Sequence, residues 1–130
     1  MKIGLIGAGR LGLCLALLME EAGYDVIASD VRVDYIDSLN QKVVDTTEPE
    51  VKELLKNSRN IYFTNSNLEV IDEADIIFTL VRTPSLENGR YDVSDVDDVI
   101  SDVLKYAWIN PNSPHKSIVI GCTTNPGDCD

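Results

Sequence analysis

The stretch Gly7-Ala8-Gly9-Arg10-Leu11-Gly12 decides the fold, because its three glycines stand between a short apolar run and a longer helical one. The run before it, Lys2–Ile6, is nearly all apolar and is typical of a buried strand. Leu11–Ala22 follows and predicts a helix, since it has apolar residues at helical spacing at Leu11, Leu15, Leu18 and Ala22. A strand, a glycine turn and a helix in this order are typical of a dinucleotide-binding loop.

Each of the three positions in this loop requires glycine for a different physical reason. Gly7 can make a tight turn that a residue with a Cβ would resist, Gly9 lets the backbone approach a pyrophosphate, and Gly12 lets the helix pack on the sheet. The start of the helix, at Arg10 and Leu11, presents free N–H groups and a partial positive charge to phosphates. We therefore expect all five residues to contact the cofactor.

The second half of the fingerprint is Asp30, at the end of a second predicted strand, Asp25–Ser29. An acidic side chain about twenty residues past the glycines can accept hydrogen bonds from an adenosine ribose and would repel a 2′-phosphate. Arg32 leaves NADP open as an alternative, because a nearby arginine can accommodate that phosphate. The position of Asp30 favours NAD, and we expect Val31 beside it to contact the cofactor as well.

The rest of the chain continues the alternation of strands and helices. Further strands are predicted at Ile61–Thr64, Asp75–Val81 and Ser117–Gly121. Helices are predicted at Val33–Asn40, from the capping sequence Thr47-Glu48-Pro49-Glu50 to about Lys56, from the capping box Ser66-Asn67-Leu68-Glu69 to about Ala74, and from an Asp92 cap to about Tyr106. The inner side of the last helix is predicted to carry Val93, Val96, Val99, Ile100, Val103 and Leu104.

This alternation predicts an α/β fold, a doubly wound parallel Rossmann sheet with strand order 3-2-1-4-5 and the ligand at the carboxyl ends of the strands. Thr83-Pro84 follows the fourth predicted strand and Thr123-Thr124 the fifth, so both are expected to face the cofactor cleft, together with Val81. Their hydroxyls can bond a nicotinamide ribose, a phosphate or water. Hydroxyl residues after strands are also common turn and cap residues, so the residues alone leave both interpretations open.

Composition narrows the classes of partner. The net charge of −11 disfavours binding to nucleic acid or anionic lipid, which requires a basic patch. The sequence has neither an apolar run of the ~20 residues that span a bilayer nor a signal peptide, so we expect a cytoplasmic protein without a membrane partner. Three cysteines without a C-x-x-C pair argue against a disulfide set or a zinc site. The acidic cluster Asp92, Asp95, Asp97 and Asp98 is interpreted as a helix N-terminus, so no metal is expected.

Further motifs occur in one order over essentially the whole chain. They are Lys2–Gly9 with Leu11-Gly12, Asp30 followed by Leu39-Asn40, Glu48-Pro49, Ala74-Asp75, Thr83-Pro84, and Ser117–Ile120 leading to Thr124-Asn125-Pro126-Gly127. In these features the chain resembles the N-terminal domain of the UDP-glucose/GDP-mannose dehydrogenase family. The glycine motif is shared by many dehydrogenases, whereas Thr-Pro and Thr-x-Pro-Gly at these places are much more selective.

The resemblance implies an NAD-dependent, two-step oxidation of the C6 alcohol of a sugar nucleotide to a carboxylate. Family members use a cysteine nucleophile, assisted by a lysine, an asparagine and a threonine of the N-terminal domain. Only the threonine has a counterpart here, Thr124, whose implied role is to position a catalytic water. The family's substrate domain and cysteine would lie beyond Asp130. The resemblance therefore implies that residues 1–130 are the NAD-binding domain of a longer, homo-oligomeric enzyme and are inactive alone.

Some positions depart from the family, and alternatives remain open. Arg10 stands where the family often has an aromatic residue, and Tyr35 where it often has a basic one. Cys122 and Cys129 lack the glycine-rich setting of the family nucleophile, and Cys14 is expected to be a packing residue. One alternative is the front domain of another NAD-dependent dehydrogenase, of the 6-phosphogluconate or 3-hydroxyacyl-CoA type. The other is a stand-alone NAD-binding regulatory module.

Overall fold

The computed structural model describes residues 1–130 and shows one five-stranded sheet in the order β3-β2-β1-β4-β5. Its strands, all paired in parallel, are β1 Lys2–Ile6, β2 Asp25–Ser29, β3 Ile61–Thr64, β4 Ile76–Thr79 and β5 Ser117–Ile120. The helices are α1 Arg10–Glu21, α2 Val33–Asn40, α3 Val51–Asn57, α4 Asn67–Glu73 and α5 Ser94–Ile109. The predicted α/β class and Rossmann strand order are confirmed.

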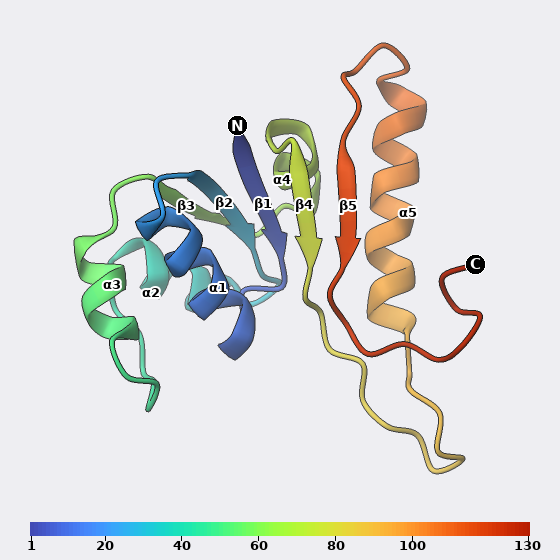
Figure 1. The fold of residues 1–130 in the computed structure, drawn as a ribbon, viewed down its shortest axis with the longest axis horizontal. Coiled ribbons are helices and arrows are strands. Elements are labelled where there is room, and N and C mark those ends of the chain that lie inside the picture. The colour runs from blue at the N-terminus through green and yellow to red at the C-terminus, as the bar shows by residue number, and fades with distance from the viewer.

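Helices cover both faces of the sheet, with α1 in front of it and α4 behind it in the view of Figure 1. The helices α1, α2 and α3 share the larger core of 13 buried residues, which includes Leu17, Leu39, Leu55 and Phe63. The helices α4 and α5 share the smaller core of 7 buried residues, which includes Ile27, Ile71, Ile77 and Val99. Because the central strands are buried on both sides, β1 is nearly all apolar and β2 has an apolar centre, Val26–Ala28, as is usual for strands of a parallel sheet.

The buried face of α1 is not the stripe of leucines at helical spacing that marks the helix in the sequence. The structure buries Gly12, Leu13, Ala16 and Leu17, whereas Leu11 is 67% and Leu18 52% exposed. This helix is apolar on most of its circumference. Its apolar periodicity therefore predicts a helix but does not predict which side of the helix is buried. The glycine turn makes that choice, because it sets the direction in which the helix leaves β1.

The predicted start of α3 is wrong. The helix begins at Val51, Glu50 before it is left-handed with φ 67°, and no side chain caps the N-terminus. The Thr47 hydroxyl, expected to be the cap, instead accepts a hydrogen bond from Arg10 Nη2 at 3.2 Å. A tertiary contact has thus taken the place of the local one.

The other capping predictions hold in part. Ser66 Oγ accepts from the backbone N–H of Glu69 at 3.3 Å, which confirms the N-terminus of α4. The predicted Asp92 cap is wrong, because the N-cap of α5 is Val93 and no side chain caps this helix. Asp92 Oδ1 instead accepts from the N–H of Ser94 at 2.9 Å, from the position before the N-cap. This helix continues to Ile109, and Leu104, predicted on its inner side, is 65% exposed. The fourth strand is shorter than predicted, since β4 spans Ile76–Thr79.

Candidate functional site

The glycine loop turns from β1 into α1 across the end of β2. The backbone N–H groups of Gly7 and Ala8 both donate to the carbonyl of Ser29, at 2.9 and 3.0 Å. Gly7 has φ 101°, and a Cβ there would lie 2.6 Å from the carbonyl oxygen of Leu80. A Cβ on Gly12 would lie 1.9 Å from the carbonyl oxygen of Gly7. Both positions require glycine because the backbones they separate are in contact.

Gly9 differs, because an added Cβ would meet no atom within 4 Å. It lines an open cleft, so a side chain here would occupy ligand space rather than clash with the protein. Gly9 is also the N-cap of α1, which has no side-chain cap and no acidic residue in its first turn. The free N–H groups and the positive end of this helix have no protein anion to satisfy them, an arrangement that fits a pyrophosphate.

The loop opens into a cleft of about 670 Å³ at the carboxyl edge of the sheet. This volume is within the range of small-molecule sites, roughly 300–1,000 Å³. Many of the residues that the sequence predicts for the cofactor line it, namely Gly7, Gly9, Arg10, Leu11, Gly12, Asp30, Val31 and Val81. The structure therefore brings the glycine fingerprint and the acidic residue of the second strand into one site.

Sequence reasoning missed several other residues that line this cleft. They are Asn67, Leu80, Arg82, Asp95, Asp98 and Val99. Arg82 Nε donates to Asp95 Oδ2 at 2.9 Å, and Asn67 Oδ1 accepts from Ser29 Oγ at 2.8 Å. Arg82 and Asn67 follow strands β4 and β3, so their place after a strand was an available signal. The residues of α5 have no such signal, because only the packing of α5 brings them to this edge.

The carboxylate of Asp30 is held mainly by Arg32. The backbone N–H and Nε of Arg32 donate to Oδ1 at 3.0 and 2.8 Å, and Nη2 donates to Oδ2 at 3.0 Å. The Asp30 side chain is 9% exposed and that of Arg32 57%. Burial by itself raises the pKa of the Asp30 carboxyl, but the hydrogen bonds and charge of Arg32 outweigh it and hold this pKa below its ordinary value. The group is therefore an ionised acceptor at neutral pH.

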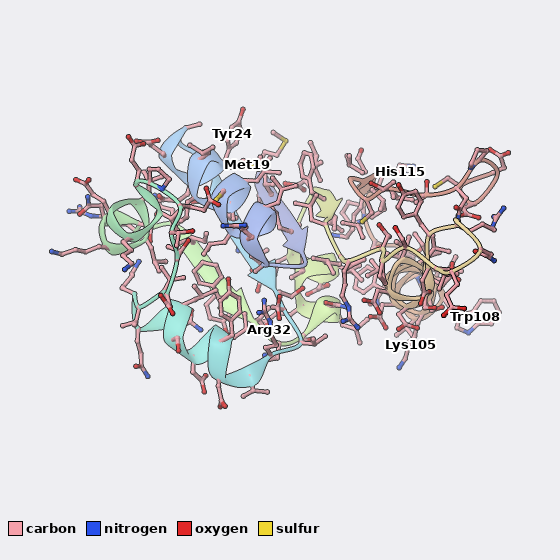
Figure 2. The ribbon with its side chains drawn as sticks, turned by 90° about the horizontal axis from the view of Figure 1, so that it is seen from below. Met19, Tyr24, Arg32, Lys105, Trp108 and His115 are labelled. Carbon is pink, nitrogen blue, oxygen red and sulfur yellow. The ribbon has the colours of Figure 1, made fainter.

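Tyr35 joins this pair to the glycine loop. Its hydroxyl donates to the carbonyl of Ala8 at 2.6 Å, and the guanidinium carbon of Arg32 lies 4.1 Å from the centre of its ring. Burial raises the pKa of the Tyr35 hydroxyl, which keeps it protonated as a donor. Figure 2 views the molecule from the carboxyl edge of the sheet and shows Arg32 near the middle of that edge. Tyr35 thus supports the guanidinium of Arg32 and is itself held by the glycine loop.

Thr83, Pro84 and Thr124 lie at the same edge of the sheet but do not line the cleft that contains Asp30. After Arg82 the chain leaves the sheet as an extended loop before it returns to α5 (Figure 1). The Thr124 hydroxyl lies 3.6 Å from the sulfur of Cys129. The structure therefore does not bring these three residues together with the glycine loop.

The loops that carry these residues are joined to each other. Asn125 Nδ2 donates to the carbonyl of Tyr91 at 3.0 Å, and its Oδ1 accepts from the Tyr91 N–H at 2.9 Å. Arg90 and Asp128 form an ion pair of 3.5 Å between the same two segments. The segment after β5 is thereby held against the loop before α5.

The cysteines show no sign of activation. The Cys122 thiol donates to the carbonyl of Thr79 at 3.2 Å, and burial raises its pKa. Cys14 packs against the larger core, as predicted, and Cys129 is exposed. No group of three or more His, Cys, Asp or Glu side chains is placed to hold a metal ion. None of the helices has the length and apolar character needed to cross a membrane.

Comparison with known protein families gives a match over the whole chain. The family described as "UDP-glucose/GDP-mannose dehydrogenase family, NAD binding domain" matches residues 1–130. The chain belongs to this family. It is an NAD-binding domain, as the glycine loop and Asp30 indicate, and the front domain of a 6-phosphogluconate or 3-hydroxyacyl-CoA dehydrogenase is excluded.

Individual relatives agree with this membership. The UDP-glucose 6-dehydrogenase of Rickettsia prowazekii is 35% identical over 132 residues, which cover 99% of this chain and 29% of that protein. The GDP-mannose 6-dehydrogenase of Pseudomonas aeruginosa is 29% identical over 130 residues, 98% of this chain and 29% of that protein. A crystal structure of a ternary complex of GDP-mannose dehydrogenase from P. aeruginosa matches with a TM-score of 0.90 and 28% identity, over 98% of this chain and 29% of that one. The chain thus spans less than a third of the length of these relatives.

Proposed function

We propose that this NAD-binding domain holds the adenosine half of NAD in the cleft beside the glycine loop. In this arrangement the pyrophosphate lies on the N-terminus of α1 next to Arg10, the ribose hydroxyls donate to Asp30, and the adenine lies between Val31 and Val81. One observation carries the proposal: an uncapped helix N-terminus and an ionised carboxylate line the same cleft. The first suits a pyrophosphate and the second a ribose diol.

We further propose that the domain serves an NAD-dependent sugar-nucleotide 6-dehydrogenase that oxidises a C6 alcohol to a carboxylate. NAD, when bound, accepts the hydride from the substrate carbon. The residues of this chain bind and orient the cofactor, and Thr124 positions the water of the second step. The cysteine nucleophile and the substrate pocket belong to a part of the enzyme outside these 130 residues, so we expect no turnover by the chain alone. The names of the relatives support a nucleotide sugar as substrate, and the description of the family supports NAD as cofactor.

Calorimetric titration of the chain with NAD and with NADP tests the cofactor site. An Asp30→Ala variant should bind NAD about 10- to 100-fold more weakly, because it loses hydrogen bonds to a charged acceptor. Asp25→Ala is the matched control, since Asp25 is exposed at the opposite end of the same strand and the variant changes the net charge equally. An equal loss in both variants, or no NAD binding by the folded chain, would contradict the proposal.

Gly9→Ala tests the pyrophosphate position without disturbing the fold. A Cβ at Gly9 meets no protein atom within 4 Å and Gly9 lines the cleft, so the variant should remain folded. We expect its NAD affinity to fall at least about tenfold, the value of one lost hydrogen bond to a charged group. Circular dichroism checks the fold and calorimetry the affinity. A Gly9→Ala variant that binds NAD like the wild type would place the pyrophosphate elsewhere.

A further inference from the structure

The carboxylate assigned to the ribose is covered in this structure. Both oxygens of Asp30 accept hydrogen bonds from Arg32, two on Oδ1 and one on Oδ2, and the Asp30 side chain is only 9% exposed although it belongs to the cleft wall. A ribose diol that donates through both of its hydroxyls needs the same two oxygens. The guanidinium of Arg32 and the ribose therefore compete for one acceptor.

The position of Arg32 suits a group that has to move. Its side chain is 57% exposed, and apart from Asp30 its guanidinium contacts the face of the Tyr35 ring. That ring is fixed, because its hydroxyl donates to the carbonyl of Ala8 in the glycine loop at 2.6 Å. A cation can slide over an aromatic face at little cost, since the attraction of the ring is not tied to one hydrogen-bond direction. Arg32 can therefore keep its contact with the Tyr35 ring when its hydrogen bonds to Asp30 break.

There is also room for the displaced side chain. Arg32 lines both the cleft and a second hollow of about 390 Å³, which lies on the side of α2 and the segment before α3. Asp45 lines this hollow and takes part in no ion pair. A guanidinium that turns away from Asp30 therefore enters a space that contains another carboxylate and the Tyr35 ring.

We propose that Arg32 is a latch on the ribose-binding carboxylate: it covers Asp30 in the free domain, has to leave before the adenosine ribose binds, and so lowers the affinity for NAD. The inference rests on the proposed role of Asp30. A residue that only oriented this carboxylate would donate to it from the protein side and leave its oxygens accessible from the cleft. Arg32 instead donates to both oxygens, and the Asp30 side chain is only 9% exposed.

The test measures the contribution of the ribose diol itself. ADP and 2′,3′-dideoxy-ADP carry the same base and phosphates, so the Kd of dideoxy-ADP divided by the Kd of ADP reports only the two hydroxyls and rises with the preference for ADP. Calorimetry gives this ratio for the wild-type chain and for Arg32→Gln, Arg59→Gln and Asp30→Ala. Loss of a positive charge affects both ligands equally and cancels. Arg59 is an exposed residue between α3 and β3 and forms no ion pair, so Arg59→Gln is the matched charge control.

If Arg32 is a latch, Arg32→Gln raises the ratio about three- to tenfold, the value of a bidentate, partly buried ion pair, and Arg59→Gln leaves it unchanged. An unchanged or lower ratio in Arg32→Gln overturns the latch and shows that Arg32 has no part in ribose binding or orients Asp30. A wild-type chain that binds NADP as tightly as NAD, and loses only NADP on Arg32→Gln, also overturns it, because Arg32 would then be a 2′-phosphate ligand.

The Asp30→Ala variant separates this failure from failure of the cofactor site. If Asp30→Ala abolishes the preference for ADP while Arg32→Gln does not increase it, Asp30 binds the ribose and only the latch is wrong. If neither variant changes the ratio, the proposed role of Asp30 fails as well. Because the Arg32 side chain is largely exposed, Arg32→Gln should fold, which circular dichroism checks.

Discussion

The two ends of the cofactor edge differ in how firmly the chain builds them. Strands β1 and β2, which lead into the glycine loop and Asp30, each have four consecutive buried residues. Strand β5, which leads towards Thr124, has no buried residue. The helix beside it, α5, ends away from the cofactor edge (Figure 1) and leaves Trp108 88% and Ile109 64% exposed. Figure 2 shows Trp108 and Lys105 pointing away from the molecule.

The difference shows which half of the candidate site is held in place by the packing of residues 1–130 themselves. The half with the glycine loop and Asp30 is held by strands packed on both faces and by glycines that allow direct backbone contact. The half near Thr83 and Thr124 depends on loops that hold each other through Asn125 and an ion pair. Hydrophobic burial is the dominant stabilising term, so the first half keeps its geometry by its own packing, while the second has few buried contacts to do so.

The largest expected effect is that of Gly12→Ala in the firmly built half. Its Cβ would lie 1.9 Å from the carbonyl oxygen of Gly7, and since both atoms belong to the backbone framework, the loop or α1 must shift. We expect a loss of about 3 kcal/mol or more in the free energy of unfolding, at or beyond the upper end for overpacked sites. Urea denaturation measures it, with Gly9→Ala as the control from the same loop. Equal stability of the two variants would show that the loop is more adaptable than the packing indicates.

A pair of leucine truncations compares the two regions directly. Leu17 on α1 is fully buried, so Leu17→Ala should reduce the free energy of unfolding by about 2–5 kcal/mol. Leu104 on α5 is 65% exposed, so Leu104→Ala should change it by less than about 0.5 kcal/mol. Both values come from chemical denaturation under the same conditions. A large loss for Leu104→Ala would mean that the end of α5 is covered in solution.

The smallest expected effect is the pH dependence of the Asp30–Arg32 pair. The pKa of Asp30 is lower in the folded chain than in the unfolded one, so the pair stabilises the fold above the unfolded pKa and this contribution is lost as the pH falls through the folded pKa. The stability difference between wild type and Asp30→Asn should therefore shrink between about pH 5 and pH 2, by under about 1 kcal/mol for a partly exposed pair. Denaturation at several pH values measures it, and a difference that grows on acidification would contradict the assigned pKa direction.

The sequence by itself determined the fold and the elements that bring the glycine loop and Asp30 into one cleft. The order of strands, the glycine loop and the place of Asp30 follow from residues close together in the chain, because turns, helix starts and parallel crossovers obey local and topological rules. The cap of α4 was also predictable, since Ser66 Oγ accepts from an N–H group three residues away. Each of these features is set by neighbours in sequence.

Only the tertiary structure decided which side chains meet. It chose the buried face of α1, it gave the Thr47 hydroxyl to Arg10 instead of α3, and it left Thr124 outside the cleft. It also laid Arg32 over Asp30 and onto Tyr35. These outcomes depend on the distances between elements far apart in the chain and on which of several rotamers finds a partner there. No periodicity or motif of a single segment contains that information.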